Sequence, residues 1–546
     1  MLFNSPEFIF LFLPLTLTLF FFSARFRASR TLLVAASLVF YSWQNPTHLL
    51  LLIGSVLLNY GVSFFFLRNE GKSRLGLFIG ISANLLLLGY FKYANWFATN
   101  TNAWLNANLA IRDIVLPLGI SFFTFQQIAY LVDTYQKKIA VGRFLDYINF
   151  VTFFPYITAG PLLRYRQIAP QFSESQTYRF QPQNLAIGIT FFALGFFKKM
   201  VIADSVAPYA NQVFEIAKTT PLTLTEAWVG ALSFTLQLYF DFSGYSDMAI
   251  GIARMFGIVL PINFHSPYKA QSIIDFWRRW HITLSNFLRD YLYIPLGGNR
   301  KGEGRRYANL MITMLLGGLW HGAGWTFVIW GGLHGFYLSV NHLWRQHSSV
   351  SLDNQADAKQ TPAQQSRFVL NFQFLSGVCT FIAVVVSWVF FRSTNVEMAV
   401  SILKSMVGLN GISLPAILAA PLGFLQNWGV QFGELMPNLA VEIEVIEDIS
   451  EPTDSNVLFI VGSLLLFVWL MPNTQQWIRL DQSLDQSTES GATKTNVDAE
   501  YTRLNSKLWQ KLQWRPTQFW AVISALLTVA ALLNLSKVSE FLYQEF

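Results

Sequence analysis

The sequence predicts an all-α protein that crosses a membrane many times. Hydrophobic residues make up 53% of its 546 residues and charged residues only 13%, about half of the roughly 25% usual in soluble domains. The apolar segments are continuous runs near the length that a membrane-spanning helix needs, not the ten-residue alternations of a β-barrel. Basic residues fall in short clusters between these runs. The net charge of +7 therefore indicates membrane topology and contact with lipids, and no nucleic-acid partner is predicted.

The N-terminal quarter predicts four spans. No basic residue precedes the first apolar run, residues 8–22, and Arg25, Arg27 and Arg30 follow it. A cleaved signal peptide has the opposite order, so we expect an uncleaved span in the cell membrane with its N-terminus outside. Further runs cover residues 32–42, 48–66 and 75–90. The uncharged residues 94–108 are predicted to form an outer loop.

The segment after the next span, residues 114–132, differs in kind. Residues 153–166 read FFPYITAGPLLRYR, where Pro155, Gly160 and Pro161 interrupt a run too short to cross the bilayer. Non-helical backbone at membrane depth is tolerated only inside protein or beside a cavity. We interpret the segment as a re-entrant or interfacial element near the cytoplasmic face; a plain amphipathic loop is the alternative.

Two spans with buried charge follow, at residues 185–203 and 227–252. The second contains Asp241 and Asp247 in an aromatic setting. Carboxylates at membrane depth usually face the bundle interior and are paired. Lys198, Lys199 and Arg254 are the predicted partners.

Residues 255–307 are basic and only partly apolar, which predicts a cytoplasmic location. Between residues 273 and 288, apolar positions recur every three or four residues, so we expect one helix there. This spacing places His281 on the same face as Trp277, with Ser285 one turn later. Asp275 is expected to pair with Arg278 or Arg279.

The last third predicts spans at residues 310–325, 326–343 and 374–391, followed by an acidic, external insert at 411–455. Residues 1–480 are expected to form one transmembrane domain, residues 481–516 a polar cytoplasmic segment, and residues 517–546 a C-terminal transmembrane helix. The total is about 11–12 spans plus re-entrant or interfacial helices. The single cysteine, Cys379, excludes an internal disulfide framework, and no metal site is predicted.

The chemistry is expected in the stretch GGLWHGAGWTFVIWGGLHG, residues 317–335. It is almost wholly apolar, yet it contains His321 and His334, and a histidine inside such a run is a functional candidate by default. A neutral imidazole there, or at His281, can act as a general base. The residues alone leave open whether each histidine is a catalyst or an interhelical hydrogen-bonding group. The sequence has no P-loop, GxSxG or HExxH motif.

Several segments together resemble the membrane-bound O-acyltransferase family. They are DFWRRWHITLSNFLRDYLYIPLGGNR and the following LWHGAGWTFVIWGGLHG, with PLGISFFTFQQIAYLVDTY, FFPYITAGPLLRY, LYFDFSGYSDMAIGIARMFG, NFHSPYKAQSI and WLMPNTQQ. The similarity is nearest to the bacterial branch, which includes alginate O-acetylation proteins and the D-alanyl transfer protein of teichoic acid synthesis. The acidic insert and the tail after residue 480 lie outside it.

The resemblance implies helices around a central tunnel, with His321 as the catalytic histidine and His281 at the second family position. It implies acyl transfer from a cytoplasmic thioester, acetyl-CoA or an acyl carrier protein, to a hydroxyl reached from the outer side; no cofactor is bound permanently. Asn286 or the Trp320 indole is expected to bind the developing oxyanion. Trp277, Asp241, Arg278 and Arg279 are expected to support the tunnel. The basic residues Arg278, Arg279, Arg289 and Arg306 are expected either to guide a phosphate of the donor or only to set the membrane topology. A covalent route through Ser285 is the less favoured alternative.

The leading hypothesis is therefore O-acetylation of an exported polysaccharide, with an extracytoplasmic acyltransferase as partner. The alternative is a transporter that moves an acyl group, a proton or a lipid-linked sugar without forming an ester. Interrupted helices and buried Asp241 and Asp247 would also suit a transporter. A purely structural scaffold of a secretion complex fits buried histidines and aspartates poorly.

Overall fold

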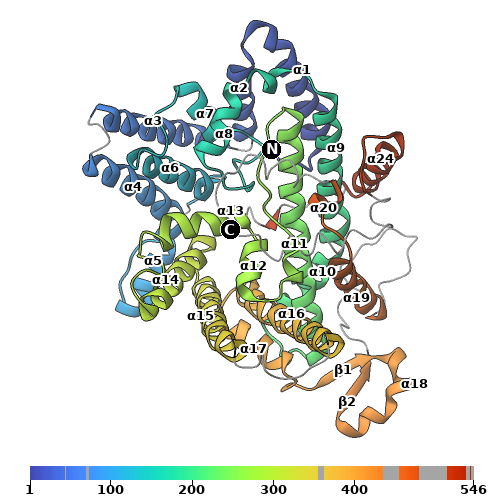
Figure 1. The fold of residues 1–546 in the computed structure, drawn as a ribbon. Coiled ribbons are helices and arrows are strands. Elements are labelled where there is room, and N and C mark those ends of the chain that lie inside the picture. Colours follow the sequence, from blue (N-terminus) through green and yellow to red (C-terminus); the bar gives the residue numbers. More distant parts are fainter. Residues whose placement is uncertain are drawn as a thin grey trace. The chain divides into compact units, whose positions relative to one another are not determined.

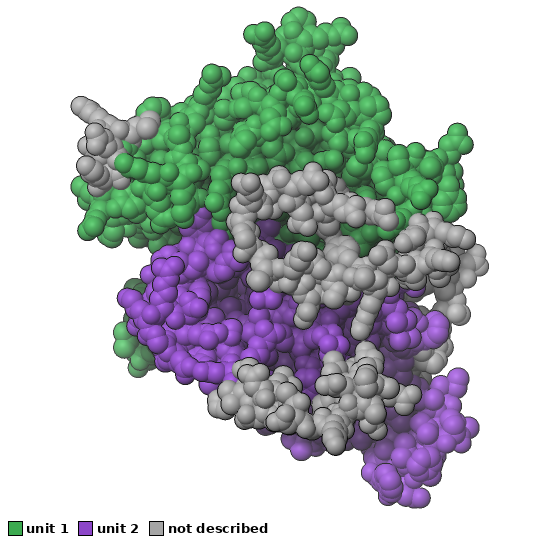
Figure 2. Space-filling view, in the orientation of Figure 1, with its two compact units in different colours: residues 1–201, 242–265, 472–546 green, residues 202–241, 266–471 purple. Residues whose placement is uncertain are grey.

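The structure is a computed structural model, and it describes residues 1–43, 45–68, 73–112, 114–353, 362–433, 454–478, 513–535 and 541–542. Apart from one two-stranded sheet, the regular elements of these residues are helices (Figure 1). The chain divides into two compact units, coloured separately in Figure 2. Unit 1 comprises residues 1–201, 242–265 and 472–546, and unit 2 comprises residues 202–241 and 266–471. The predicted cytoplasmic segment, residues 481–516, lies mostly outside the described residues.

Unit 1 holds the N-terminal helices. They are α1 (Leu13–Ser23), α2 (Ser29–Ser42), α3 (Thr47–Arg68), α4 (Arg74–Leu88), α5 (Ala94–Leu105), α6 (Ile120–Tyr135), α7 (Phe144–Thr152), α8 (Tyr165–Ser173) and α9 (Pro182–Phe197). The second half of α11 (Leu224–Met255) joins them, with α20 (Thr474–Ile478) and α24 (Gln518–Leu532). Close contacts join α4 to α6 and α24 to α9.

Unit 2 holds the histidine-bearing helices. They are α12 (Ile273–Arg279), α13 (Ile282–Leu288), α14 (Glu303–His321) and α15 (Trp325–Asp353), with α16 (Pro362–Arg392) and α17 (Val396–Met406). The unit also contains α10 (Asp204–Ile216), the first half of α11, and α19 (Asp454–Leu470). A small parallel sheet pairs β1 (Ile412–Pro415) with β2 (Val430–Gly433) around α18 (Ala419–Leu422). The pair α14 and α15 makes the most extensive helix–helix contact.

Five helical segments among the described residues are long and apolar enough to cross a membrane: Glu7–Phe26, Thr47–Phe66, Arg74–Leu105, Pro182–Ile216 and Phe372–Arg392. Shorter apolar helices cover Ser29–Ser42, Asn456–Leu470 and Gln518–Leu532. The all-α membrane fold is thus confirmed. The total of 11–12 spans stays a prediction.

The prediction of a loop at residues 94–108 is wrong, because most of this segment is helical. Ala94–Leu105 forms α5, which continues α4 through a π-helical turn, Gly89–Tyr93. The prediction of a loop rests on the absence of charged residues from this segment. Charge distribution indicates which side of the membrane a segment faces, but it does not determine the backbone conformation.

The segment FFPYITAGP is non-helical and wholly buried inside unit 1. Phe153, Phe154 and Tyr156 are 0% exposed, and the backbone turns there without forming a helix. Gly119, with a φ of +67°, lies so close that a Cβ on it would stand 2.2 Å from the carbonyl oxygen of Ile157. The prediction of irregular backbone enclosed by protein is confirmed, and its depth in the membrane stays a prediction.

A buried ion pair in unit 1 confirms one predicted partner of Asp247. The Nζ of Lys198 donates to the Asp247 carboxylate at 2.6 Å and to the Thr474 hydroxyl at 2.8 Å. The same carboxylate accepts from Thr474 at 2.7 Å and from the Gln475 amide at 3.0 Å. Thr474 and Gln475, at the end of the late motif WLMPNTQQ, therefore fix α20 to α11 in this unit. Asp241 is also buried, at 1% exposed, on the part of α11 that belongs to unit 2.

Candidate active site

His281 lies at a break between two helices, and the prediction of one continuous helix over residues 273–288 is wrong. α12 ends at Arg279, and His281 adopts a left-handed conformation with a φ of +42° before α13 begins at Ile282. The amide of Ser285 then donates to the carbonyl oxygen of His281 at 3.0 Å, so His281 caps the second helix. Such a conformation is uncommon for a non-glycine residue, although histidine adopts it more readily than most, and it favours a functional role for the position. The apolar periodicity does not reveal the break because the buried face continues across it.

Glycines bring α14 and α15 close together around His321. A Cβ on Gly318 would stand 2.2 Å from the carbonyl oxygen of Phe327, and one on Gly331 would stand 2.3 Å from that of Met314. Only glycine permits this approach of the two backbones. His321 is the last residue of α14, and this packing fixes its position against α15.

Aromatic rings enclose the His321 imidazole, which is 4% exposed. Ring centroids lie 4.9 Å away for Trp320, 5.0 Å for Trp330 and 5.3 Å for Phe391. The Trp320 ring also lies 6.3 Å from that of His281, so both predicted histidines contact the same indole. The Trp330 side chain is buried, and its indole nitrogen has no hydrogen-bond partner among the described residues.

His334 is held at both ring nitrogens. The indole N–H of Trp277 donates to its Nδ1 at 3.2 Å, and its Nε2 lies 3.1 Å from the Ser387 hydroxyl. Since Nδ1 accepts, the neutral ring carries its proton on Nε2 and donates it to Ser387. That hydroxyl can in turn donate to the carbonyl oxygens of Ala383 or Val384. Neither nitrogen of His334 is free to take a proton from a substrate, which fits a structural role.

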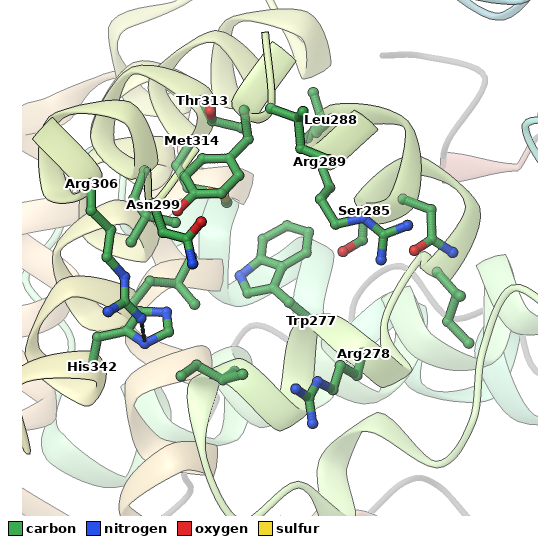
Figure 3. Close-up of a pocket in the computed structure, with 17 residues that line it drawn as sticks. Trp277, Arg278, Ser285, Leu288, Arg289, Asn299, Arg306, Thr313, Met314 and His342 are labelled. Atoms are coloured by element: carbon green, nitrogen blue, oxygen red, sulfur yellow. Dashed lines mark hydrogen bonds between the residues drawn. The ribbon is translucent and has the colours of Figure 1, made fainter. Parts of the chain in front are cut away.

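Trp277 also lines a cavity of about 570 Å³, whose wall residues are drawn in Figure 3. Three arginines line it, namely Arg278, Arg289 and Arg306. The polar residues of its wall include Ser285, Asn286, Asn299, Thr313 and His342, and Arg306 is hydrogen-bonded to His342. Trp277 forms another part of the wall. Its ring lies 6.0 Å from that of Trp330, the direct neighbour of His321, although His321 itself does not line this cavity.

Comparison with known proteins identifies this arrangement. The sequence profile of the membrane-bound O-acyltransferase family (MBOAT) matches residues 79–388, which include both predicted histidines and the ring cluster except Phe391. The chain belongs to the membrane-bound O-acyltransferase family. It is therefore an acyltransferase of the membrane, as the sequence predicted.

Curated MBOAT relatives are similar over most of their length. A peptidoglycan O-acetyltransferase of Helicobacter pylori is 44% identical over 445 residues, covering 76% of this chain and 81% of the relative. A probable alginate O-acetylase of Azotobacter vinelandii is 42% identical, covering 78% and 82%. A teichoic acid D-alanyltransferase of Streptococcus thermophilus is 28% identical, covering 44% of this chain and 60% of that protein.

The predicted MBOAT site residues fall into two adjoining groups. His321, His281 and Trp320 belong to the ring cluster, whereas Ser285, Asn286 and Arg278 line the cavity. Trp277 belongs to both groups. Two residues lie outside these groups: Arg279 is buried and paired with Asp275 at 3.0 Å, and Asp241 does not line the cavity.

Sequence reasoning missed the residues that enclose His321. Trp330, Trp388 and Phe391 come from α15 and α16; the Trp330 and Trp388 rings stack at 5.7 Å, and Phe391 lies 5.4 Å from Trp330. The available signal was the spacing of Trp330 and His334 by four residues, which places both on one face of α15. Nothing in the sequence distinguishes Trp388 and Phe391 of α16 as site residues, because aromatic residues are common in apolar membrane spans.

Proposed function

We propose that this membrane-bound O-acyltransferase moves an acetyl group from a cytoplasmic thioester to a hydroxyl of an exported polysaccharide. The observation that carries the proposal is the His321 imidazole, enclosed by aromatic rings next to a cavity lined by three arginines. The relatives named for peptidoglycan and alginate acetylation support acetyl as the group and a polysaccharide as the acceptor. We place the protein in the cell membrane with its N-terminus outside, and an extracytoplasmic acyltransferase as its partner.

His321 acts as the general base in this scheme. As the acceptor hydroxyl attacks the thioester carbonyl, its proton passes to the imidazole and a tetrahedral oxyanion forms. Collapse of that intermediate re-forms the carbonyl and breaks the carbon–sulfur bond. The leaving thiolate takes the proton from the imidazolium, which restores the neutral ring. Exclusion of water by the surrounding rings favours transfer to the acceptor over hydrolysis.

Trp330 supplies a donor for the oxyanion. A buried N–H without an acceptor costs free energy. The unpaired indole N–H of Trp330 beside His321 is explained if it donates to the substrate. Its ring lies 5.0 Å from that of His321. At this distance both rings can contact the same reacting carbonyl group of the substrate. Asn286 and Trp320, the donors expected from sequence, remain alternatives.

Replacing Trp330 by phenylalanine is expected to lower kcat by about 10²–10³-fold, the usual cost of one oxyanion donor, with little change in KM. The ring packing is largely kept, so the membrane level should stay at that of the wild type. Trp388→Phe is the matched control: it removes a second buried indole N–H, which also has no hydrogen-bond partner among the described residues, from a ring that stacks on Trp330 rather than on His321. It should cost far less. Equal losses in both variants would contradict a donor role for Trp330.

The basic cavity is the proposed donor site, where arginines bind phosphate groups of coenzyme A or of a carrier-bound phosphopantetheine. Arg306→Gln is expected to raise KM for acetyl-CoA about 10-fold or more, with kcat nearly unchanged. Acetyl-pantetheine, which lacks the phosphates, should show no such change. Arg305→Gln replaces the neighbouring exposed arginine, which does not line the cavity, and serves as control. An equal rise in KM for both donors would contradict phosphate binding here.

The overall reaction is tested with protein reconstituted in vesicles and labelled acetyl-CoA added on the cytoplasmic side. We expect release of free coenzyme A together with ester-linked label on a glycan acceptor or on the partner protein. Movement of label without thiol release would indicate transport instead. Deletion of the gene, followed by analysis of alkali-labile esters on the cell surface, identifies the acceptor; an unchanged ester content would contradict the proposal.

A further inference from the structure

A small lobe of unit 2 follows α17 in the chain. It consists of residues 407–433, and we call it the β lobe. Its parallel strands β1 and β2 are connected by three short helices, Ala416–Leu418, α18 and Gly423–Trp428. None of these helices exceeds six residues, so the β lobe is not one of the membrane spans.

The β lobe has no charged side chain. From Ser405 to Gly433 the sequence contains no Asp, Glu, Lys, Arg or His. Its large apolar side chains nevertheless lie at the surface. The most exposed are Val407 (71%), Leu409 (70%), Ile417 (69%), Phe424 (60%) and Trp428 (81%). An exposed apolar patch of this kind marks a contact surface with protein or membrane.

The interior of the β lobe is too small to stabilise it in water. Among its residues only Pro415 and Val430 are buried. A two-stranded sheet with so small a core is at best marginally stable by itself. The exposed apolar residues of the connecting helices therefore need an apolar surrounding.

Hydrogen bonds fix the base of the β lobe to the first turns of α11. The amide of Leu224 donates to the carbonyl oxygen of Gly411 at 3.0 Å, and the hydroxyls of Thr223 and Ser413 lie 2.6 Å apart. Directly before the β lobe, the indole of Trp228 donates to the carbonyl oxygen of Met406, the last residue of α17, at 2.9 Å. The β lobe is thus held at one end of a long helix of a membrane protein.

We propose that the β lobe is a membrane-interface anchor, with its helical half inserted into the headgroup region of the bilayer. Two observations favour lipid over a protein surface. The patch offers no charge for a partner to pair with, and its most exposed side chain is a tryptophan, the residue that concentrates at the membrane–water interface. Insertion would hold the start of α11 at a fixed depth.

The test uses single cysteines on the full-length protein in lipid nanodiscs. The exposed Cys379 is first replaced by serine, and an environment-sensitive NBD label is then attached to Phe424→Cys, Trp428→Cys or Ile417→Cys. Gln431→Cys, an exposed polar position on β2, is the matched control. We expect blue-shifted emission at the three apolar positions and quenching by lipids with a nitroxide near the headgroup. The control should show water-like emission and little quenching.

Two results would overturn the proposal. Water-like emission at 417, 424 and 428, with no quenching by the labelled lipid, would place the patch in solvent. Blue-shifted emission without lipid quenching would show that protein covers it instead. Acyl transfer activity is measured for each labelled variant to verify that its fold is intact. Because three positions are labelled independently, the test still stands if one variant does not fold.

Discussion

Replacing His321 by alanine is expected to lower acyl transfer by about 10²–10⁴-fold, the range that a general base contributes. The reason is that the side chains in ring contact with His321, those of Trp320, Trp330 and Phe391, contain no base that could take over the proton. His281 lies on the far side of the Trp320 indole, and the nitrogens of His334 are engaged by Trp277 and Ser387. The membrane level should not change, because alanine keeps the helix end. The measurement is thiol release from labelled acetyl-CoA, with ester formation on the acceptor.

His48→Ala is the matched control for this variant. His48 is half-buried near the start of α3 in unit 1, where its ring contacts Asn45 at 3.4 Å. It should retain wild-type transfer. Wild-type ester formation by His321→Ala would show that the imidazole takes no part in the chemistry, and the proposed mechanism would have to be abandoned.

Replacing Asp247 by alanine is expected to cost about 3–5 kcal/mol of folding free energy, the usual effect of leaving one buried partner of an ion pair uncompensated. The Asp247 side chain is 2% exposed and that of Lys198 16%, so water cannot replace the lost carboxylate. Against a total stability of about 5–15 kcal/mol, this loss should lower both the amount of folded protein and its Tm. Thermal aggregation in detergent, followed by size-exclusion chromatography, measures the change.

The double variant Asp247→Asn with Lys198→Met separates charge from packing. It removes both charges and should be more stable than Asp247→Ala, because no lone ammonium remains buried. Glu215→Gln breaks the exposed pair with Lys218 at 2.5 Å and should change Tm little, as surface pairs contribute about 0–1 kcal/mol. A double variant no better than Asp247→Ala would argue against the ion pair as the source of the effect.

The sequence predicted the fold class and the family because both depend on features that are local in the chain. Apolar runs, charge clusters and the motif around His321 can be read without three-dimensional contacts. The pairing of Asp247 was predictable only as a choice among three cations, since the distance between helices decides it. Lys198 is the partner because α9 and α11 approach closely at Gly195 and Gly244, each without room for a Cβ.

The surroundings of the site were less predictable. The ring cluster depends on α16, which supplies Trp388 and Phe391 from more than fifty residues downstream of His321. Geometry also decides the different roles of two adjacent arginines on the short helix α12. Arg278 lines the cavity, whereas Arg279 forms an ion pair with Asp275. Neither property is encoded in periodicity, which treats both arginines as one basic cluster.

The left-handed backbone at residue 281 restricts which amino acids evolution can place there. Glycine, asparagine, aspartate and histidine tolerate such dihedral angles, whereas β-branched residues do not. An asparagine would therefore keep the chain path while exchanging an imidazole for an amide, and valine would disturb the path itself. Chemical variation at this position is confined to glycine and a few polar side chains, so the backbone between α12 and α13 limits which groups can stand beside Trp320.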